Sequence, residues 1–188
     1  MATIYLVRHG KAAAGWDADP DPGLHADGVA QAQAVAGRLA ARTGPIEVFS
    51  SPLRRARETA APLAERWGSD VRILPAIGEI PSPTADLVER TDWLAGALRG
   101  RWANLGGAVA AWRRDLLSAV AAAGASGANV VWFTHFVAIN AMVGAATDRP
   151  EVTVFLPANA SVTEVQVDAA SGTWRVASLG LEASPEVG

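Results

Sequence analysis

The chain has 188 residues and half of them are apolar, so a single domain can bury a substantial core. Its formal net charge of -3 comes from 19 acidic and 16 basic residues that form no long block of either sign, which argues against a nucleic-acid-binding surface. Because the chain contains no cysteine, it has no disulfides, thiolate metal sites or thiol nucleophiles, and this is consistent with a reducing cell interior.

Two apolar stretches raise the question of a membrane segment or a leader. Residues 1–7 are too few for a secretory signal, and their charges follow the apolar run instead of preceding it. Residues 129–146 are interrupted by a Thr-His pair and by Asn140, which predicts a core strand followed by a core helix. We therefore expect a cytoplasmic protein with no membrane contact.

Strand and helix patterns alternate along the first 74 residues. The β-branched run at residues 3–7 predicts a strand buried on both faces, and residues 27–42 have apolar positions at helical spacing. A second strand and a second helix are predicted at residues 46–49 and 53–67, and a third strand at residues 71–74. This alternation favours a parallel sheet covered by helices.

The pattern weakens at about residues 75–107, where proline, glycine and scattered tryptophans interrupt it. We expect an insertion or lid there, mostly helical. The tryptophans Trp16, Trp93 and Trp102 are candidates either for lining such a lid or for core packing. The remaining predicted elements are a helix, a strand, a helix and a final strand pair, at residues 105–123, 129–133, 137–146, 161–167 and 174–178.

Basic and imidazole side chains follow three of the predicted strands. The sequence RHG comes at residues 8–10, SSPLRRA at residues 50–56 and THF at residues 134–136. In open α/β sheets, ligands bind outside the carboxyl ends of the strands. Two imidazoles and at least two guanidinium groups are therefore expected to share one crevice.

These motifs resemble those of the histidine phosphatase superfamily, which is also called phosphoglycerate-mutase-like. RHG, SSPLRRARETA and the late TH occur in the family's order and spacing, and LHADGVAQAQ at residues 24–33 resembles the family's helix after the first loop. The resemblance extends from residue 3 to about residue 163. It implies one domain over residues 1–188, built as a three-layer α/β/α sandwich with a mostly parallel central sheet and a helical lid at about residues 75–107.

The resemblance also implies roles for four residues. His9 would be the nucleophile that takes the phosphoryl group, and Arg8, Arg55 and His135 would surround its oxygens. Physical arguments support these roles, because guanidinium forks match phosphate geometry and neighbouring cations favour the neutral, attacking form of an imidazole. No metal and no organic cofactor is expected.

Glu79 is the candidate for the carboxyl group that the family uses to protonate the departing oxygen. It follows the third predicted strand at about the family's distance and lies at the start of the expected lid. The negative charge of a bound phosphate would raise the pKa of a nearby carboxyl, which suits a general acid. The alternative is that Glu79 caps or solvates a loop.

Several neighbours of these residues have a structural interpretation. Arg54 and Arg57 crowd the same helix start as Arg55, but the family places its arginine directly before alanine, which selects Arg55. Glu58 is expected to pair with Arg54 at helical spacing. His25 stands where relatives usually have threonine and is expected to be structural.

Four positions depart from the family pattern, namely Lys11, Ala12, Phe136 and Asn140. Lys11 is followed by alanine where relatives often have acidic and hydroxyl residues, and Phe136 replaces a common glycine after the second histidine. Asn140 stands where many relatives have arginine, so a contact to a second substrate charge is expected to be missing. These departures alter the pocket wall and leave the substrate's identity open.

We therefore expect a phosphomonoester hydrolase that acts on a small phosphorylated substrate through a phosphohistidine. One alternative is a cofactor-dependent phosphoglycerate mutase. Another is a catalytically weak member of the family that keeps the pocket for phosphate binding or scaffolding. The apolar late segments are compatible with a homodimer.

Overall fold

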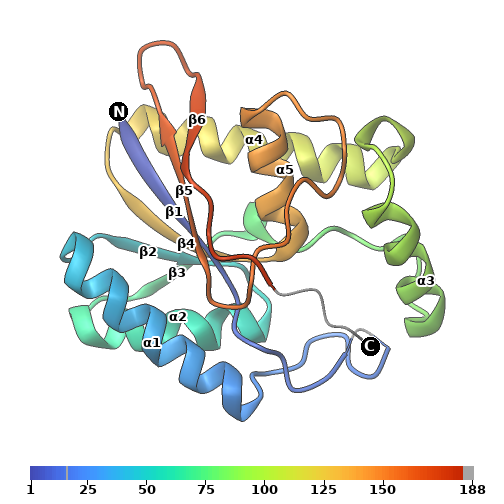
Figure 1. Cartoon of the computed structure of the whole chain (residues 1–188), viewed down its shortest axis with the longest axis horizontal. Helices are drawn as coiled ribbons and strands as arrows, with labels where there is room; N and C mark the ends of the chain where they lie inside the picture. The colour runs from blue at the N-terminus through green and yellow to red at the C-terminus, as the bar shows by residue number, and fades with distance from the viewer. Residues whose placement is uncertain (16, 184–188) are drawn as a thin grey trace.

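The computed structural model describes residues 1–15 and 17–183. Within these residues a single six-stranded sheet has the order β3-β2-β4-β1-β5-β6 (Figure 1). The strands are β1 Ala2–Arg8, β2 Glu47–Ser50, β3 Val71–Ile73, β4 Val130–Thr134, β5 Val162–Val167 and β6 Trp174–Ser178. The pairings among β1 to β4 are parallel, whereas β5 pairs antiparallel with both β1 and β6. The expectation of a mostly parallel sheet is confirmed.

Helices cover both faces of this sheet. The helices of the described residues are α1 Ala26–Thr43, α2 Arg54–Trp67, α3 Leu87–Leu98, α4 Gly107–Ser126 and α5 Phe136–Ala146. In Figure 1, α1 and α2 lie together on one side of the sheet, and α4 and α5 lie on the other. The three-layer α/β/α sandwich is therefore confirmed.

The two hydrophobic cores follow from the alternation of side chains along buried strands. In β1, Ile4 and Leu6 pack into the core shared with α4 and α5, while Tyr5 and Val7 pack into the core shared with α1 and α2. Successive side chains of a strand point to opposite faces, so a strand between two helical layers must be apolar at every position. This explains why β1 is buried and largely apolar on both faces from Ile4 to Val7 and becomes charged only at Arg8, where the strand ends.

The segment expected to be a mostly helical lid contains one full helix, α3. Two single 3-10 turns, Pro75–Ile77 and Trp102–Asn104, flank it, and residues 78–86 are not helical. Pro81 and Pro83 explain this difference, because proline has no N–H to donate and forces the residue before it out of the helical region. α3 then begins after Asp86, whose carboxylate accepts from the N–H groups of Val88 and Glu89.

The tryptophans of this region pack against the core. Trp102 is 9% exposed within the core beneath α4 and α5, and Trp93 packs against the same cluster. Trp16 lies outside the described residues. No helix in the described part of the chain is long and apolar enough to cross a membrane.

Three parallel strands end at the same level, which positions the motifs. Arg8 at the end of β1 is in register with Thr134 at the end of β4, and Ser50 at the end of β2 is in register with Phe133. The segments that follow these strands therefore start side by side at one edge of the sheet, as the motif positions predict.

The turn after β1 packs directly on the start of α1. A Cβ atom on Gly10 would lie 2.6 Å from the carbonyl oxygen of Gly28, and one on Gly28 would lie 2.2 Å from the carbonyl oxygen of Lys11. Both distances are far inside van der Waals contact, so only glycine allows the two backbones to approach this closely. The Gln31 side chain also accepts the Lys11 N–H at 2.8 Å.

Candidate active site

The backbone of His9 is held by three parts of the chain. Its N–H donates to the carbonyl oxygen of Thr134 at 3.0 Å, and its own carbonyl accepts from the Asn159 amide at 3.0 Å. The next N–H, of Gly10, donates to the Thr59 hydroxyl of α2 at 3.0 Å. The direction in which the His9 ring points is therefore fixed by β4, by α2 and by the loop before β5.

The ring of His9 is held in one tautomer. Its Nδ1 lies 2.8 Å from the carbonyl oxygen of Gly10, and because a carbonyl only accepts, Nδ1 must carry the hydrogen. Nε2 then has the free lone pair of the neutral ring, and the Nε–H of Arg55 donates to it at 3.2 Å. Burial, followed by the positive charge of Arg55, lowers the pKa of His9 to about 3, so the ring is neutral at ordinary pH.

Arg54 and Arg55 point in different directions from the first turn of α2. Arg55 is 3% exposed and faces His9, while Arg54 faces solvent and forms an ion pair with Glu58 at 2.6 Å. Asp21 lies on the outer side of Arg55, with 3.9 Å between its Oδ1 and a guanidinium nitrogen. The expected pairing of Glu58 with Arg54 is present, and the arginine before alanine is the one that contacts His9.

Arg8 is held at the end of β1 by a loop and by an aromatic ring. Its Nη1 donates to the carbonyl oxygen of Pro157 at 2.7 Å, and its guanidinium carbon lies 5.4 Å from the ring centroid of Phe136. Its buried Nε has no hydrogen-bond partner among the described residues. Burial lowers the pKa of the Arg8 guanidinium, and the nearby Glu79 opposes this shift.

His135 lies beside His9, with 5.1 Å between the two ring centroids. Its Nε2 is 2.7 Å from the Ser51 hydroxyl, which also accepts from the N–H of Leu53 at 3.2 Å. The buried Nδ1 has no hydrogen-bond partner in the described part of the chain and lies 4.0 Å from a carboxylate oxygen of Glu79. Burial, followed by electrostatic interactions with His9, Arg55 and Arg8, lowers the pKa of His135 well below its ordinary value.

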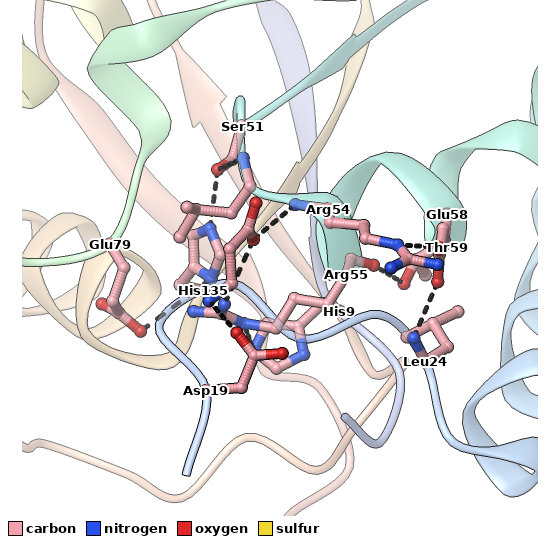
Figure 2. Close-up of polar contacts among 12 residues, drawn as sticks. His9, Asp19, Leu24, Ser51, Arg54, Arg55, Glu58, Thr59, Glu79 and His135 are labelled. Atoms are coloured by element: carbon pink, nitrogen blue, oxygen red, sulfur yellow. Dashed lines mark hydrogen bonds and ion pairs between the residues drawn. The ribbon is translucent and has the colours of Figure 1, made fainter. Parts of the chain in front are cut away.

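Glu79 approaches His135 from one direction and Ser51 approaches it from another (Figure 2). The Glu79 side chain is 4% exposed, and its Oε1 accepts the N–H of Ile80 at 3.0 Å. Burial raises the pKa of Glu79 to about 7, although that hydrogen bond and the charges of Arg55 and Arg8 oppose the shift. Near neutral pH this carboxyl group therefore occurs in both its protonated and its ionised form.

All five residues singled out in the sequence thus gather at one end of the sheet, and two cavities open beside His9. The first, here called the polar cavity, has a volume of about 370 Å³ and is lined by Lys11, Asp19, His25, Arg90 and Asn159 in addition to Arg8, His9 and Arg55. The second, here called the apolar cavity, has a volume of about 280 Å³, and Arg8, His9 and Glu79 share its wall with Leu94, Leu98, Phe136 and Val137.

The positions that depart from the family pattern have different surroundings. Asn140 is buried, and its side-chain oxygen accepts from the N–H groups of Val154 and Phe155, so it connects α5 to a loop and lines neither cavity. Lys11 lines the polar cavity while paired with Asp27 at 2.9 Å. His25 precedes α1 and accepts from the Asp27 N–H, in agreement with a structural role.

Four residues that hold the site were not singled out in the sequence. They are Ser51, Thr59, Pro157 and Asn159. The first two are contained in the SSPLRRARETA motif, and Thr59 follows Arg55 by one helical turn, so a helical reading of that motif could have identified it. The other two lie 149 and 150 positions from Arg8 and His9, the residues that they hold, and carry no local signal.

No group of three or more metal-binding side chains lies close together in the described residues. Guanidinium groups provide positive charge that could meet an anion. Arg8 and Arg55 both lie against His9, while Asp19 lines the polar cavity and Asp21 lies 3.9 Å from the Arg55 guanidinium.

Neutral imidazoles beside buried guanidinium groups, at the carboxyl edge of an α/β sheet, are typical of enzymes that handle phosphoryl groups. A model of the histidine phosphatase superfamily, branch 1, matches residues 4–181. The chain therefore belongs to the histidine phosphatase superfamily, as its motifs predict.

Three similar proteins are mycobacterial. The chain is 46% identical over 82 residues to the PE-PGRS family protein PE_PGRS11 and 37% identical over 114 residues to the uncharacterized protein Rv0525, both of Mycobacterium tuberculosis strain ATCC 25618 / H37Rv. These matches cover 41% and 58% of this chain, but only 14% and 48% of those proteins. The mycobacterial glucosyl-3-phosphoglycerate phosphatase Rv2419c, solved with VO3, has a TM-score of 0.73 and 25% identity, and the match covers 98% of this chain and all of that one.

Proposed function

We propose that this protein hydrolyses a small phosphomonoester in two steps through a phosphohistidine on His9, with no metal or organic cofactor. The observation that carries the proposal is the state of the His9 ring. Its Nδ1–H is held by the Gly10 carbonyl, its pKa is lowered to about 3, and its Nε2 lone pair lies against Arg55. A neutral imidazole in one fixed tautomer is what a nitrogen nucleophile requires.

In the first step, Nε2 of His9 forms a bond to phosphorus as the bond from phosphorus to the leaving oxygen breaks. Glu79 gives its proton to that oxygen, and its pKa of about 7 makes the proton available at neutral pH. In the second step, water attacks the phosphohistidine, the Glu79 carboxylate takes a proton from that water, and phosphate leaves with Nε2 restored.

The other residues act on the charge of the transferred group. Phosphoryl transfer has a loose transition state with charge spread over three oxygens, so catalysis is mainly positioning and electrostatic stabilisation. Arg8 and Arg55 supply fixed positive charge, and Nδ1 of His135 can donate when Ser51 donates to Nε2 of the same ring. The buried Nε of Arg8 and Nδ1 of His135 have no partner among the described residues, which supports an oxygen-rich ligand between them.

The test is to trap the phosphorylated protein by rapid quenching with a labelled aryl phosphate. We expect acid-labile, base-stable phosphate on the wild type and on His25→Asn, which keeps a side chain able to cap α1. We expect none on His9→Ala. Chelators should leave turnover unchanged and vanadate should inhibit it. Full turnover by folded His9→Ala would rule out the mechanism, and loss of activity with chelators would point to a metal-assisted reaction.

A further inference from the structure

Of the two cavities beside His9, the apolar cavity is the one whose described lining includes Glu79. The carboxyl group lines the apolar cavity together with Arg8 and His9, and it is absent from the described residues that line the polar cavity. A general acid must come within hydrogen-bond distance of the oxygen that it protonates. That oxygen joins phosphorus to the leaving group, so the leaving group begins beside Glu79.

Apart from Arg8, His9 and Glu79, the described residues that line the apolar cavity have no hydrogen-bonding side chain. They are formed by Leu94 and Leu98 of α3 and by Phe136 and Val137 of α5. We propose, on the basis of the phosphatase function proposed above, that the preferred substrate is a phosphomonoester with a small apolar leaving group, which packs against these four side chains.

Both the chemistry and the size of the cavity support this assignment. A hydroxyl or ammonium group placed against these side chains would lose its water without gaining a partner, which is unfavourable. Each methylene that leaves water contributes about 0.8 kcal/mol, which corresponds to roughly fourfold in kcat/KM. The volume of about 280 Å³ lies just below the usual range of about 300–1,000 Å³ for ligand pockets, so the leaving group is small.

The two leucines of α3 allow the wall to be changed without altering the phosphate site. Leu94 and Leu98 are one helical turn apart and therefore share a face of α3. Leu94 is 9% exposed and belongs to the core, whereas Leu98 is only partly buried. Leu98→Gln is therefore the variant that changes the wall at the smaller cost in stability. Val88, 66% exposed on the same helix, provides the matched control Val88→Gln.

The experiment measures kcat/KM for methyl, ethyl, propyl and butyl phosphate and for glycerol phosphate and phosphoserine. We expect a rise of roughly fourfold for each methylene until the cavity is full, with both polar phosphates at least tenfold below butyl phosphate. Leu98→Gln should flatten the series, and Val88→Gln should leave it unchanged. A flat or falling series in an enzyme whose hydrolysis of methyl phosphate depends on His9 overturns the apolar assignment and leaves the phosphatase function intact.

Binding of alkylphosphonates tests the apolar subsite independently of the proposed hydrolysis. These compounds place the alkyl chain where the leaving group would lie, but they contain no ester bond to break. If no phosphomonoester is hydrolysed in a His9-dependent way, the proposed function fails. Calorimetry with methyl- and butylphosphonate then shows whether the apolar cavity binds an alkyl chain. Tighter binding of butylphosphonate supports the apolar subsite, and equal or weaker binding overturns it.

Discussion

Arg55 donates the hydrogen on its Nε to Nε2 of His9 at 3.2 Å, across the 46 positions that separate them in the chain. The guanidinium charge of Arg55 therefore lies beside Nε2 of His9, the nitrogen proposed to attack phosphorus. An incoming phosphate competes for the same donors, because its oxygens are stronger acceptors for a guanidinium than a neutral ring nitrogen is. Substrate binding is therefore expected to release Nε2 for reaction.

This contact leads to a prediction about two adjacent arginines. Arg55→Lys should lower kcat/KM by roughly 10² or more, because lysine provides a single point charge in place of a planar pair of donors. Arg54→Lys should change it by less than about threefold, because the Arg54 side chain is exposed and forms its ion pair with Glu58 at the surface. Steady-state kinetics on an aryl phosphate measure both. The opposite ranking would show that the wrong arginine has been assigned.

The Thr59 hydroxyl joins the two sides of the site. It accepts from Gly10 N–H at 3.0 Å and donates to the carbonyl oxygen of Arg55 at 2.7 Å. Thr59→Val should lower kcat by roughly 10- to 100-fold, because it leaves the N–H beside His9 unpaired and allows the ring to shift. Thr59→Ser keeps the hydroxyl and should restore kcat to within a few-fold. Equal activity of the two folded variants would show that the hydroxyl does not position the site.

Glu79→Gln should separate substrates by their leaving groups. Hydrolysis of an alkyl phosphate should fall by roughly 10²- to 10⁴-fold, whereas an aryl phosphate, whose leaving group needs no proton, should be largely spared. In the wild type, alkyl turnover should decline as pH rises through about 7, because Glu79 then loses its proton. Equal losses on both substrates would indicate a binding or structural role for Glu79.

The same carboxyl group makes stability depend on pH. The pKa of Glu79 is about 7 in the folded protein against an ordinary value of 4.5, so between these values the folded state binds more protons than the unfolded state. The free energy of unfolding of the wild type should therefore fall, relative to that of Glu79→Gln, by up to about 3 kcal/mol as pH rises from 4.5 to 7.

Urea unfolding of the two proteins at a series of pH values measures this difference. His9 acts in the opposite direction, because its pKa is lowered from 6.5 to about 3 and its contribution to stability is lost as pH falls through that range. The His9 contribution is present in both proteins and cancels in their difference. A difference that does not change with pH would show that Glu79 titrates normally in the folded protein.

We propose that the site releases phosphate to water and does not act as a mutase. A mutase must shield its phosphohistidine from water and bind an intermediate with two phosphates, which requires further cations. Lys11 and Arg90 line the polar cavity, but Lys11 is paired with Asp27. With 3-phosphoglycerate and a catalytic amount of the bisphosphate, we expect free phosphate and little 2-phosphoglycerate. Rapid isomerisation with negligible phosphate release would reverse this assignment.

The sequence predicts the centre of the fold better than its periphery. Buried parallel strands such as β1 and β4 are short apolar runs, and the residues that directly follow them, His9 and His135, must share one edge of the sheet. The boundaries of most elements agree within three residues. Residues 78–86 differ, because their prolines prevent the helix that was expected there.

The supports of the site were harder to predict, because they depend on contacts between distant segments. Pro157 holds Arg8 with a backbone carbonyl, which any residue type could supply, so its sequence carries no signal. Asn159 reaches the carbonyl of His9 from a loop whose path is set by the antiparallel strand β5. Burial, which the sequence does not report residue by residue, is also the largest cause of the shifted pKa values of His9 and Glu79.

The contact between Gly10 and Gly28 also determines where the protein can bend. With backbone touching backbone, the His9 turn and the start of α1 must move as one rigid piece, since neither can shift without the other. On the opposite side of the pocket, residues 78–86 lack helical hydrogen bonds and lead into α3. A hinge that admits substrate and releases product is therefore expected at residues 81–86, beyond the buried Glu79 and Ile80, while the proposed nucleophile His9 stays in place.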